Sequence, residues 1–279
     1  MLRTRKAVLV LAFAAIALVA AGCQEADVEK ALGNVYQRVE AGQGWAVLTE
    51  ATDGVRELLY VTLAGDTVRP LGSAQTVTGA AEADLKVEKG LVVVETKKDG
   101  APQYTAFRYG AAGLEPVDYY TLYAPEPAQK TGHTVYVNKR LNALWHFADG
   151  RLVKVYRVAT GRQTQPPVPT WQDYRTNFFT PEGIFEITDF KRNPPYNALK
   201  AGDRSFSGGA PGNPLGTRWM GFSVLAGDGA GIWGIHGTAE PEKIGTWASD
   251  GCIRMYTEQA EELFEGLRGH RVTVQIVAN

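Results

Sequence analysis

Short alternating apolar segments separated by tight-turn signals run through most of this chain, and they favour a fold built from β-hairpins. The clearest signals are Asp53-Gly54, Asp99-Gly100 and Asp149-Gly150. Asp-Gly pairs adopt the positive φ values that a two-residue hairpin turn requires. Further strands are expected at 183–188, 219–225, 232–235 and 272–277. The sequence therefore predicts a mainly β protein.

Only one late segment has a clear helical pattern. We expect Thr257 to cap this helix with its side chain and Gly269 to end it. Its apolar face is predicted to consist of Ala260, Leu263, Phe264 and Leu267. A single helix among many strands leaves the mainly β prediction unchanged.

The segment 40–123 is predicted to be a small β-rich module that carries no chemistry. Its hairpin pattern around Gly44 and Val47 recurs 46 residues later around Gly90 and Val93. This is either a repeat, which suggests a small β-sandwich or two packed meanders, or a chance similarity between hairpins. Segment 24–39 is expected to form a short helix or a tether, 124–132 a Pro-containing linker, and 133–277 a mostly β region with the late helix.

Composition excludes several classes of protein. The chain has 279 residues and a net charge of −1, so no basic surface for nucleic acid is indicated. It has two cysteines, Cys23 and Cys252, which is too few for a disulfide-stapled scaffold.

The N-terminus reads as an export signal. Arg3, Arg5 and Lys6 precede an apolar run that ends at Ala21-Gly22-Cys23. This ending resembles the lipobox of bacterial lipoproteins, although Ala20 stands where family members usually have leucine. Residues 1–22 are then a signal peptide and Cys23 is lipidated, which anchors the protein in a membrane facing the periplasm or cell wall. The alternative is an ordinary signal peptide that happens to contain a cysteine.

The second cysteine has the neighbours that a nucleophile needs. A free thiol titrates near 8.5, so a nucleophilic cysteine requires a base or a cation, and His236 is the histidine placed to help. Cys252 follows Gly251, beside which backbone N–H groups can point at a developing oxyanion. The pair alone also fits an inert buried cysteine.

Two motifs, Ile235-His-Gly-Thr238 and Ser249-Asp-Gly-Cys-Ile-Arg-Met255, resemble the signature of the L,D-transpeptidase catalytic domain, the YkuD-type family. The resemblance extends over about 133–277, with supporting stretches at 135–137, 180–185, 209–216, 218–222 and 271–274. It implies a mostly β sandwich with the catalytic cysteine at one end of a cleft.

The resemblance implies acyl transfer in peptidoglycan. Cys252 attacks the carbonyl at the L-centre of diaminopimelate in a tetrapeptide stem, the terminal D-residue leaves, and a thioester forms. An amine acceptor then gives a 3→3 cross-link or attaches a protein, whereas water makes the enzyme an L,D-carboxypeptidase or amidase. His236 takes the thiol proton and later protonates the leaving amine.

The same resemblance gives roles to neighbouring residues. The backbone of Gly237 orients the imidazole, the N–H groups of Gly251 and Cys252 form the oxyanion hole, and Ser249 shapes the loop. Arg254 either holds a substrate carboxylate or makes a structural salt bridge.

Many family members have histidine where this chain has Asp250, and a carboxylate close to the thiol raises its pKa. Three tryptophans are expected to be core rather than cleft: Trp219, Trp233 and Trp247. Three other histidines, without metal-ligand spacing, are expected on the surface or in the core: His133, His146 and His270.

The expected partners are peptidoglycan stem peptides, a membrane through the lipid anchor, and a carbapenem as covalent inhibitor. No cofactor, metal or nucleic acid is expected. A non-catalytic wall-binding lipoprotein, in which the module 40–123 does the work, is the remaining alternative. Gln24 is not the aspartate that favours inner-membrane retention, which points weakly to the outer membrane.

Overall fold

The computed structural model describes residues 35–49, 55–64, 67–78, 82–161, 179–198, 204–222 and 233–278. The predicted signal peptide, Cys23 and the turn at Asp53-Gly54 lie outside the described residues. The chain divides into two compact units, one made of Met1–Lys97 and Gln103–Tyr119, the other of Lys98–Pro102 and Tyr120–Asn279. The segment boundaries expected at 123 and 133 stay predictions.

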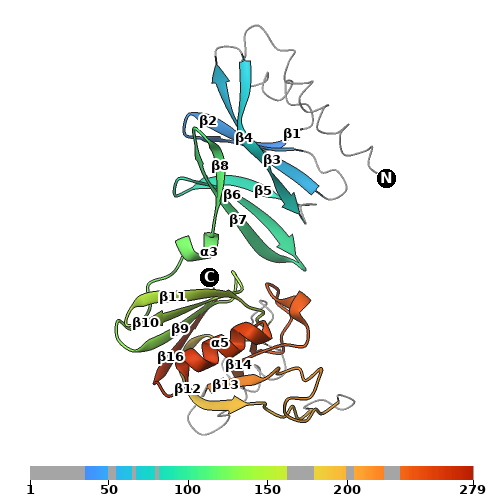
Figure 1. Ribbon diagram of the computed structural model, residues 1–279, viewed down its shortest axis with the longest axis vertical. Helices are drawn as coiled ribbons and strands as arrows, with labels where there is room; N and C mark the ends of the chain where they lie inside the picture. Colours follow the sequence, from blue (N-terminus) through green and yellow to red (C-terminus); the bar gives the residue numbers. More distant parts are fainter. Residues whose placement is uncertain are drawn as a thin grey trace. The chain divides into compact units, whose positions relative to one another are not determined.

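The first unit contains two four-stranded antiparallel sheets, each a meander (Figure 1). The first sheet has the order β1-β2-β3-β4, with strands β1 (Val35–Ala41), β2 (Gly44–Thr49), β3 (Val55–Ala64) and β4 (Thr67–Thr78). The second has the order β5-β6-β7-β8, with strands β5 (Asp84–Glu88), β6 (Leu91–Lys98), β7 (Ala101–Gly110) and β8 (Gly113–Val117).

Both sheets contribute to one core. Leu48 and Leu58 of the first sheet and Val92, Val94 and Phe107 of the second belong to the same buried cluster. Of the positions aligned by the 46-residue offset, Val47 and Val93 occupy matching strands, β2 and β6. Gly44 begins β2, whereas Gly90 lies in the turn before β6.

The helix considered for 24–39 is wrong where the structure describes it. Val35–Val39 belongs to β1, which pairs with β2 from Val35↔Thr49 to Ala41↔Gly44. Tyr36 and Glu40 are exposed, whereas Gln37 through Val39 are half-buried. Pairing with β2 has overridden a weak helical spacing.

The second unit is built on one curled eight-stranded sheet with the order β11-β10-β9-β16-β12-β13-β14-β15 (Figure 1). Its strands are β9 (His133–Asn138), β10 (Ala143–Ala148), β11 (Arg151–Arg157), β12 (Gly183–Arg192), β13 (Arg218–Phe222), β14 (Trp233–His236), β15 (Ile253–Arg254) and β16 (Val272–Val277). The described helices are α3 (Tyr119–Leu122), a 3-10 turn at Pro241–Lys243 and α5 (Thr257–Leu267).

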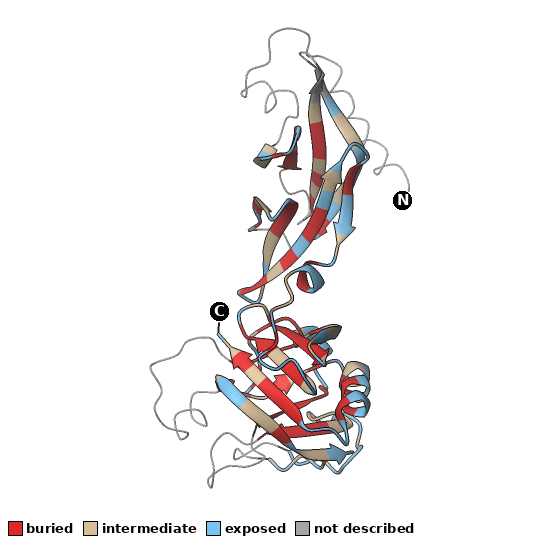
Figure 2. Cartoon of the chain, turned by 90° about the vertical axis from the view of Figure 1, so that its left-hand side faces the viewer, coloured by how far each residue is buried: buried red, intermediate tan, exposed pale blue. Residues whose placement is uncertain are grey.

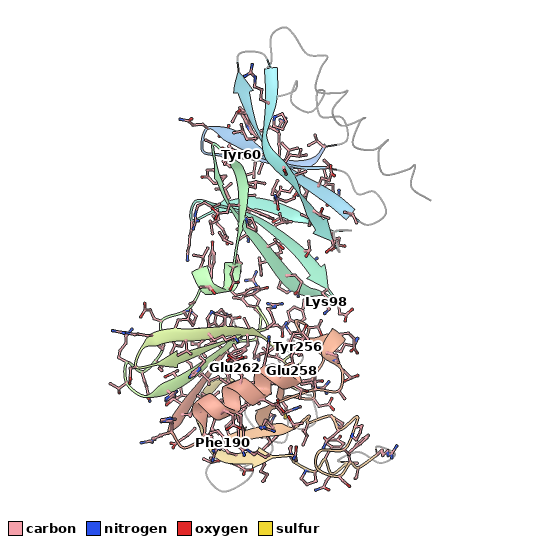
Figure 3. All side chains as sticks on the ribbon, in the orientation of Figure 1. Tyr60, Lys98, Phe190, Tyr256, Glu258 and Glu262 are labelled. Carbon is pink, nitrogen blue, oxygen red and sulfur yellow. The ribbon has the colours of Figure 1, made fainter. Side chains whose placement is uncertain are left out.

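The predicted late helix is confirmed as α5, and its buried residues are the four expected ones, Ala260, Leu263, Phe264 and Leu267. It packs on β13 and β14, and Phe190 of β12 meets Phe264 edge-on at 5.5 Å, while Glu258 and Glu262 lie on the same helix (Figure 3). The apolar face of α5 and the buried residues of the strands form the hydrophobic core of the unit (Figure 2).

The predicted cap of α5 is wrong. The N-cap is Tyr256 and makes no side-chain cap hydrogen bond, whereas Thr257 is the first helical residue. The Thr257 hydroxyl instead donates to the carbonyl of Thr238 at 3.3 Å, because the loop after β14 passes beside the helix start.

The prediction of a mainly β fold with one late helix is confirmed. The Asp149-Gly150 turn has φ values of +49° and +74°, as a tight hairpin requires. In the described part of the chain, no helix has the length and apolar character needed to span a bilayer.

Candidate active site

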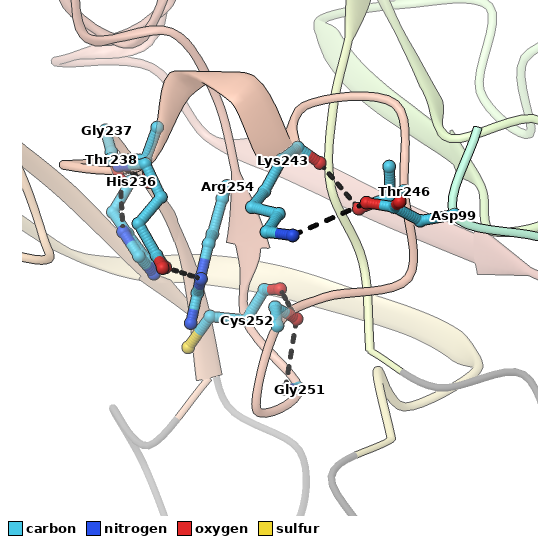
Figure 4. Close-up of polar contacts among 11 residues, drawn as sticks. Asp99, His236, Gly237, Thr238, Lys243, Thr246, Gly251, Cys252 and Arg254 are labelled. Carbon is cyan, nitrogen blue, oxygen red and sulfur yellow. Dashed lines mark hydrogen bonds and ion pairs between the residues drawn. The ribbon is translucent and has the colours of Figure 1, made fainter. Parts of the chain in front are cut away.

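One short parallel ladder brings the two sequence motifs together. Strand β14 ends at His236, and β15 begins directly after Cys252. The strands pair in parallel, with Ile235 opposite Ile253 and His236 opposite Arg254. His236, Cys252 and Arg254 therefore meet at one edge of the sheet (Figure 4).

The imidazole of His236 is buried and oriented. Its Nδ1 lies 2.6 Å from the carbonyl oxygen of Gly237. A carbonyl only accepts, so Nδ1 carries the proton and Nε2 carries the lone pair of the neutral ring. Burial, and next the charge of Arg254, lower the pKa of His236 to about 4, against the opposing hydrogen bond to Gly237. The ring is therefore neutral at pH 7 and Nε2 can accept a proton.

Gly237 also has to be a glycine. A Cβ atom built on it would lie 2.9 Å from the Thr257 hydroxyl oxygen and 3.2 Å from the Cα of Gly216. A side chain would push the loop away from α5 and move the carbonyl that holds the imidazole.

Cys252 rests as a thiol. Burial raises the pKa of Cys252 to about 11, a backbone hydrogen bond from Gly234 and the charge of Arg254 oppose that rise, and Asp250 adds to it. The contribution of Asp250 has the sign that the sequence predicts. Because the thiol titrates above pH 7 and the imidazolium below it, the resting pair is neutral, and the thiolate forms only as Nε2 takes the proton.

The loop before β15 is shaped by one hydroxyl. Ser249 Oγ donates to the carbonyl of Cys252 at 2.5 Å and accepts the N–H of Gly251 at 3.1 Å. Gly251 has a φ of +115°, and a Cβ there would lie 2.7 Å from the carbonyl oxygen of Phe179. Only glycine fits this turn.

The expected oxyanion role of Gly251 needs a correction. Its N–H is already donated to Ser249 Oγ, so it does not point freely into the site. The sequence motif indicates a glycine but not which acceptor its N–H reaches, because that acceptor is a side chain within the same turn.

The segment from Val158 to Gly161 holds the loop before β15 through backbone hydrogen bonds. The two sequence motifs do not predict this contact. Ala159 and Arg254 exchange two backbone hydrogen bonds of 2.9 Å. Ser249 N–H donates to the carbonyl of Thr160 at 3.0 Å, and Gly245 N–H donates to that of Val158 at 2.9 Å. The edge strand β15 is therefore held between β14 and this segment.

Arg254 makes an ion pair. Its Nη1 lies 2.8 Å from Oε2 of Glu240, and the Arg254 side chain is 17% exposed against 56% for Glu240. The structural pairing considered for Arg254 is thus present. Its charge also acts on both Cys252 and His236, as the pKa shifts of those groups indicate.

The tryptophans differ in their surroundings. Trp219 and Trp233 are buried, and Trp247 is half-buried with its Nε1 donating to the carbonyl of Lys139 at 2.9 Å. Trp219 stacks on the His236 ring, with centroids 5.7 Å apart. Sequence reasoning missed this contact, although the register Trp219↔His236 follows once β13 and β14 are paired.

Three histidines that are distant in sequence lie together away from these residues. His133 Nδ1 is 3.0 Å from His146 Nε2, and the rings of His133 and His270 are 4.3 Å apart. Local spacing gave no sign of this cluster, because β9, β10 and the bend that precedes β16 come together only in the folded sheet. Within the described ranges, no group of His, Cys, Asp and Glu side chains is arranged to hold a metal ion.

Comparison with known proteins agrees with the two motifs. The family model of the L,D-transpeptidase catalytic domain, YkuD, matches residues 132–274. YqjB of Bacillus subtilis, which is provisionally named an L,D-transpeptidase, is 40% identical over 141 residues, covering 50% of this chain and 69% of YqjB. YkuD of Bacillus subtilis, named in the same way, is 31% identical over 128 residues, covering 45% of this chain and 56% of YkuD.

The solved structures that are similar to this chain include an L,D-transpeptidase (Yku) from Stackebrandtia nassauensis. The alignment has a TM-score of 0.39 and 20% sequence identity, and it covers 56% of this chain and 60% of that one.

Proposed function

Because the chain belongs to the L,D-transpeptidase catalytic domain family, we propose that it is a peptidoglycan L,D-transpeptidase that uses Cys252 as nucleophile and His236 as general base. The observation that supports this most strongly is the neutral imidazole fixed by Gly237 at the end of β14, beside the strand that follows Cys252.

In the first half-reaction the Sγ–H bond of Cys252 breaks as Nε2 of His236 takes the proton. The sulfur attacks the carbonyl carbon at the L-centre of diaminopimelate in a tetrapeptide stem. His236 then returns the proton to the leaving amine, and the terminal D-residue departs. A thioester on Cys252 remains.

The oxyanion of the tetrahedral intermediate is held by the N–H of Cys252. The N–H of Gly251 is donated to Ser249 Oγ at 3.1 Å and is not counted as an oxyanion donor. The Arg254 guanidinium, whose present partner Glu240 is half exposed, holds a substrate carboxylate bidentately once that partner is displaced.

In the second half-reaction an amine of a neighbouring stem or protein resolves the thioester. Water in its place makes the protein an L,D-carboxypeptidase or amidase, because both reactions share one intermediate. The whole chain is exported and held at a membrane by lipidated Cys23, and it acts on the wall side.

The deciding experiment is intact mass spectrometry of the full-length protein in detergent after incubation with a carbapenem. An adduct on the wild type that is absent from Cys252→Ala and His236→Ala supports the proposal. No adduct, together with no release of D-alanine from diaminopimelate muropeptides, rules it out and favours a wall-binding lipoprotein.

Transfer and hydrolysis are separated by the products. The same muropeptides are incubated with and without an added acceptor amine, and product masses are compared. A dimer or amine adduct indicates a transferase, and a tripeptide stem alone indicates a hydrolase.

A further inference from the structure

Trp219 lies against the imidazole of His236. The two residues are register partners on the antiparallel strands β13 and β14, so their side chains leave the same face of the sheet. Their rings are 5.7 Å apart and inclined by 23°, and the side chains are 7% and 3% exposed. The contact is a buried stack, and neither ring is free to turn into solvent.

Two glycines fix the plane of the indole. Gly221 and Gly234 are the next pair on the same face. A Cβ on Gly221 would lie 2.6 Å from Trp219 Nε1, and one on Gly234 would lie 2.8 Å from Trp219 Cζ2. The indole therefore packs on the backbone of two residues that have no side chain. The imidazole of His236 contacts Trp219 through one ring face and the carbonyl of Gly237 through Nδ1.

Proton transfer places a positive charge on the ring that Trp219 contacts. When the Cys252 S–H bond breaks and an N–H bond forms at His236 Nε2, the products are a thiolate and an imidazolium. Burial and the charge of Arg254 both disfavour that imidazolium. The face of an indole within about 6 Å of a cation attracts it.

We propose that Trp219 is a positioning residue for the thiol deprotonation, holding the His236 ring toward Cys252 and stabilising the imidazolium as it forms. The inference rests on the proposed function and adds to it a residue outside the two sequence motifs. The interaction with charge exists only after proton transfer, so Trp219 acts on the rate of acylation and not on binding.

Among the described residues, four other charged or titratable groups lie near His236, and the Trp219 variants compared below leave all of them in place. Arg254 faces His236 from β15, Glu240 pairs with Arg254, and Cys252 and Asp250 belong to the loop before β15.

The test compares Trp219→Phe, which keeps an aromatic face, with Trp219→Leu, which does not. Full-length protein is acylated by a carbapenem over a concentration series, which separates the maximal rate from the half-saturating concentration. We expect Trp219→Leu to lower the maximal rate about 3- to 30-fold at an unchanged half-saturating concentration. Trp219→Phe retains most of the rate.

Trp145→Leu is the control for loss of a buried indole. Trp145 is 1% exposed on β10, and its Nε1 donates to the carbonyl of Tyr120 at 2.8 Å. This variant loses thermal stability but keeps the acylation rate of the folded protein. If Trp219→Leu does not fold, Trp219→Met takes its place, since methionine adapts to irregular space.

A second readout does not depend on acylation. Nitrogen-15 NMR of the His236 ring is expected to give a lower pKa in Trp219→Leu than in the wild type, with Trp219→Phe close to the wild type. The inference is overturned if the wild type and both Trp219 variants have the same maximal acylation rate. It is also overturned if both variants lose the same fraction of that rate and all three proteins have the same His236 pKa. If the wild type is not acylated, the proposed function fails, and an unchanged His236 pKa in Trp219→Leu then overturns the inference separately.

Discussion

His236 and Arg254 stand directly opposite each other on the parallel strands β14 and β15, so a permanent cation faces a neutral imidazole. The same cation favours the thiolate of Cys252. One charge thus stabilises the ionised nucleophile and at the same time opposes the protonated base.

Replacing Arg254 by Met is expected to raise the pKa of both His236 and Cys252, because each loses a positive neighbour. The two shifts act in opposite directions on the transfer of the thiol proton to His236. Acylation at pH 7 should still slow about tenfold, because the carboxylate of the acylating compound loses its guanidinium partner, and a hydrogen bond to a charged group is worth about 1.5–3 kcal/mol. Glu240→Gln is the matched control: it removes the partner of Arg254 but keeps the cation. It should change the free energy of unfolding by less than about 1 kcal/mol and leave acylation as fast or faster. Equal slowing in both variants would show that the ion pair, and not the cation, matters.

Asp250→Asn is expected to lower the pKa of Cys252, because the carboxylate raises it. At pH 7 the rate of alkylation by iodoacetamide should rise about two- to threefold, and the gain should shrink at high salt, which screens exposed charges. Asp250→Glu keeps the charge and should behave like the wild type. A rate that is the same for Asn and Glu at low salt would contradict the electrostatic explanation.

Gly251→Ala is expected to reduce acylation about 100-fold, since a misplacement of about 1 Å is enough for such a loss. The added Cβ would lie 2.7 Å from the Phe179 carbonyl oxygen and 2.8 Å from Trp233 Nε1, and a backbone carbonyl cannot yield cheaply. Gly269→Ala has a similar positive φ of +91° with nothing within 4 Å, so it carries the backbone strain without the clash. It should acylate normally, and a comparable loss there would point to general instability.

His146 should make the second unit sensitive to acid. Burial, with help from His133, lowers the pKa of His146 to about 4, against the opposing charge of Glu262. An unfolded histidine titrates near 6.5, so the stabilisation is complete above that pH and declines as the pH falls toward 4. The loss amounts to about 3 kcal/mol for this 4% exposed side chain.

Urea unfolding at pH 7.5 and pH 4.5 measures this effect. The difference in unfolding free energy between the two pH values should be smaller by about 3 kcal/mol in His146→Gln than in the wild type. Identical pH dependence of the two proteins would contradict the assignment. His236, which has the same direction of shift, contributes to the part that remains.

What the sequence predicted well depends on local rules. The Asp149-Gly150 turn and the four apolar residues of α5 each follow from a period or a turn type that needs no distant partner. The mainly β fold follows from many such signals together.

What it predicted poorly depends on distant partners. Thr257 bonds to Thr238 and does not cap its helix, and Val35–Val39 follows the pairing demands of β2. In the candidate site, the two motifs identify Cys252 and His236. The stack of Trp219 and the bracing by Val158–Gly161 depend on which strands become neighbours, which one sequence does not specify.

The raised pKa of Cys252 affects more than the proposed reaction. Peroxides and disulfides are attacked by thiolate and not by thiol, so the oxidation of a cysteine slows as its ionised fraction falls. Folding therefore makes this sulfur less sensitive to adventitious oxidants than it is in the unfolded chain. In the proposed reaction, transfer of the thiol proton to His236 Nε2 makes the sulfur nucleophilic.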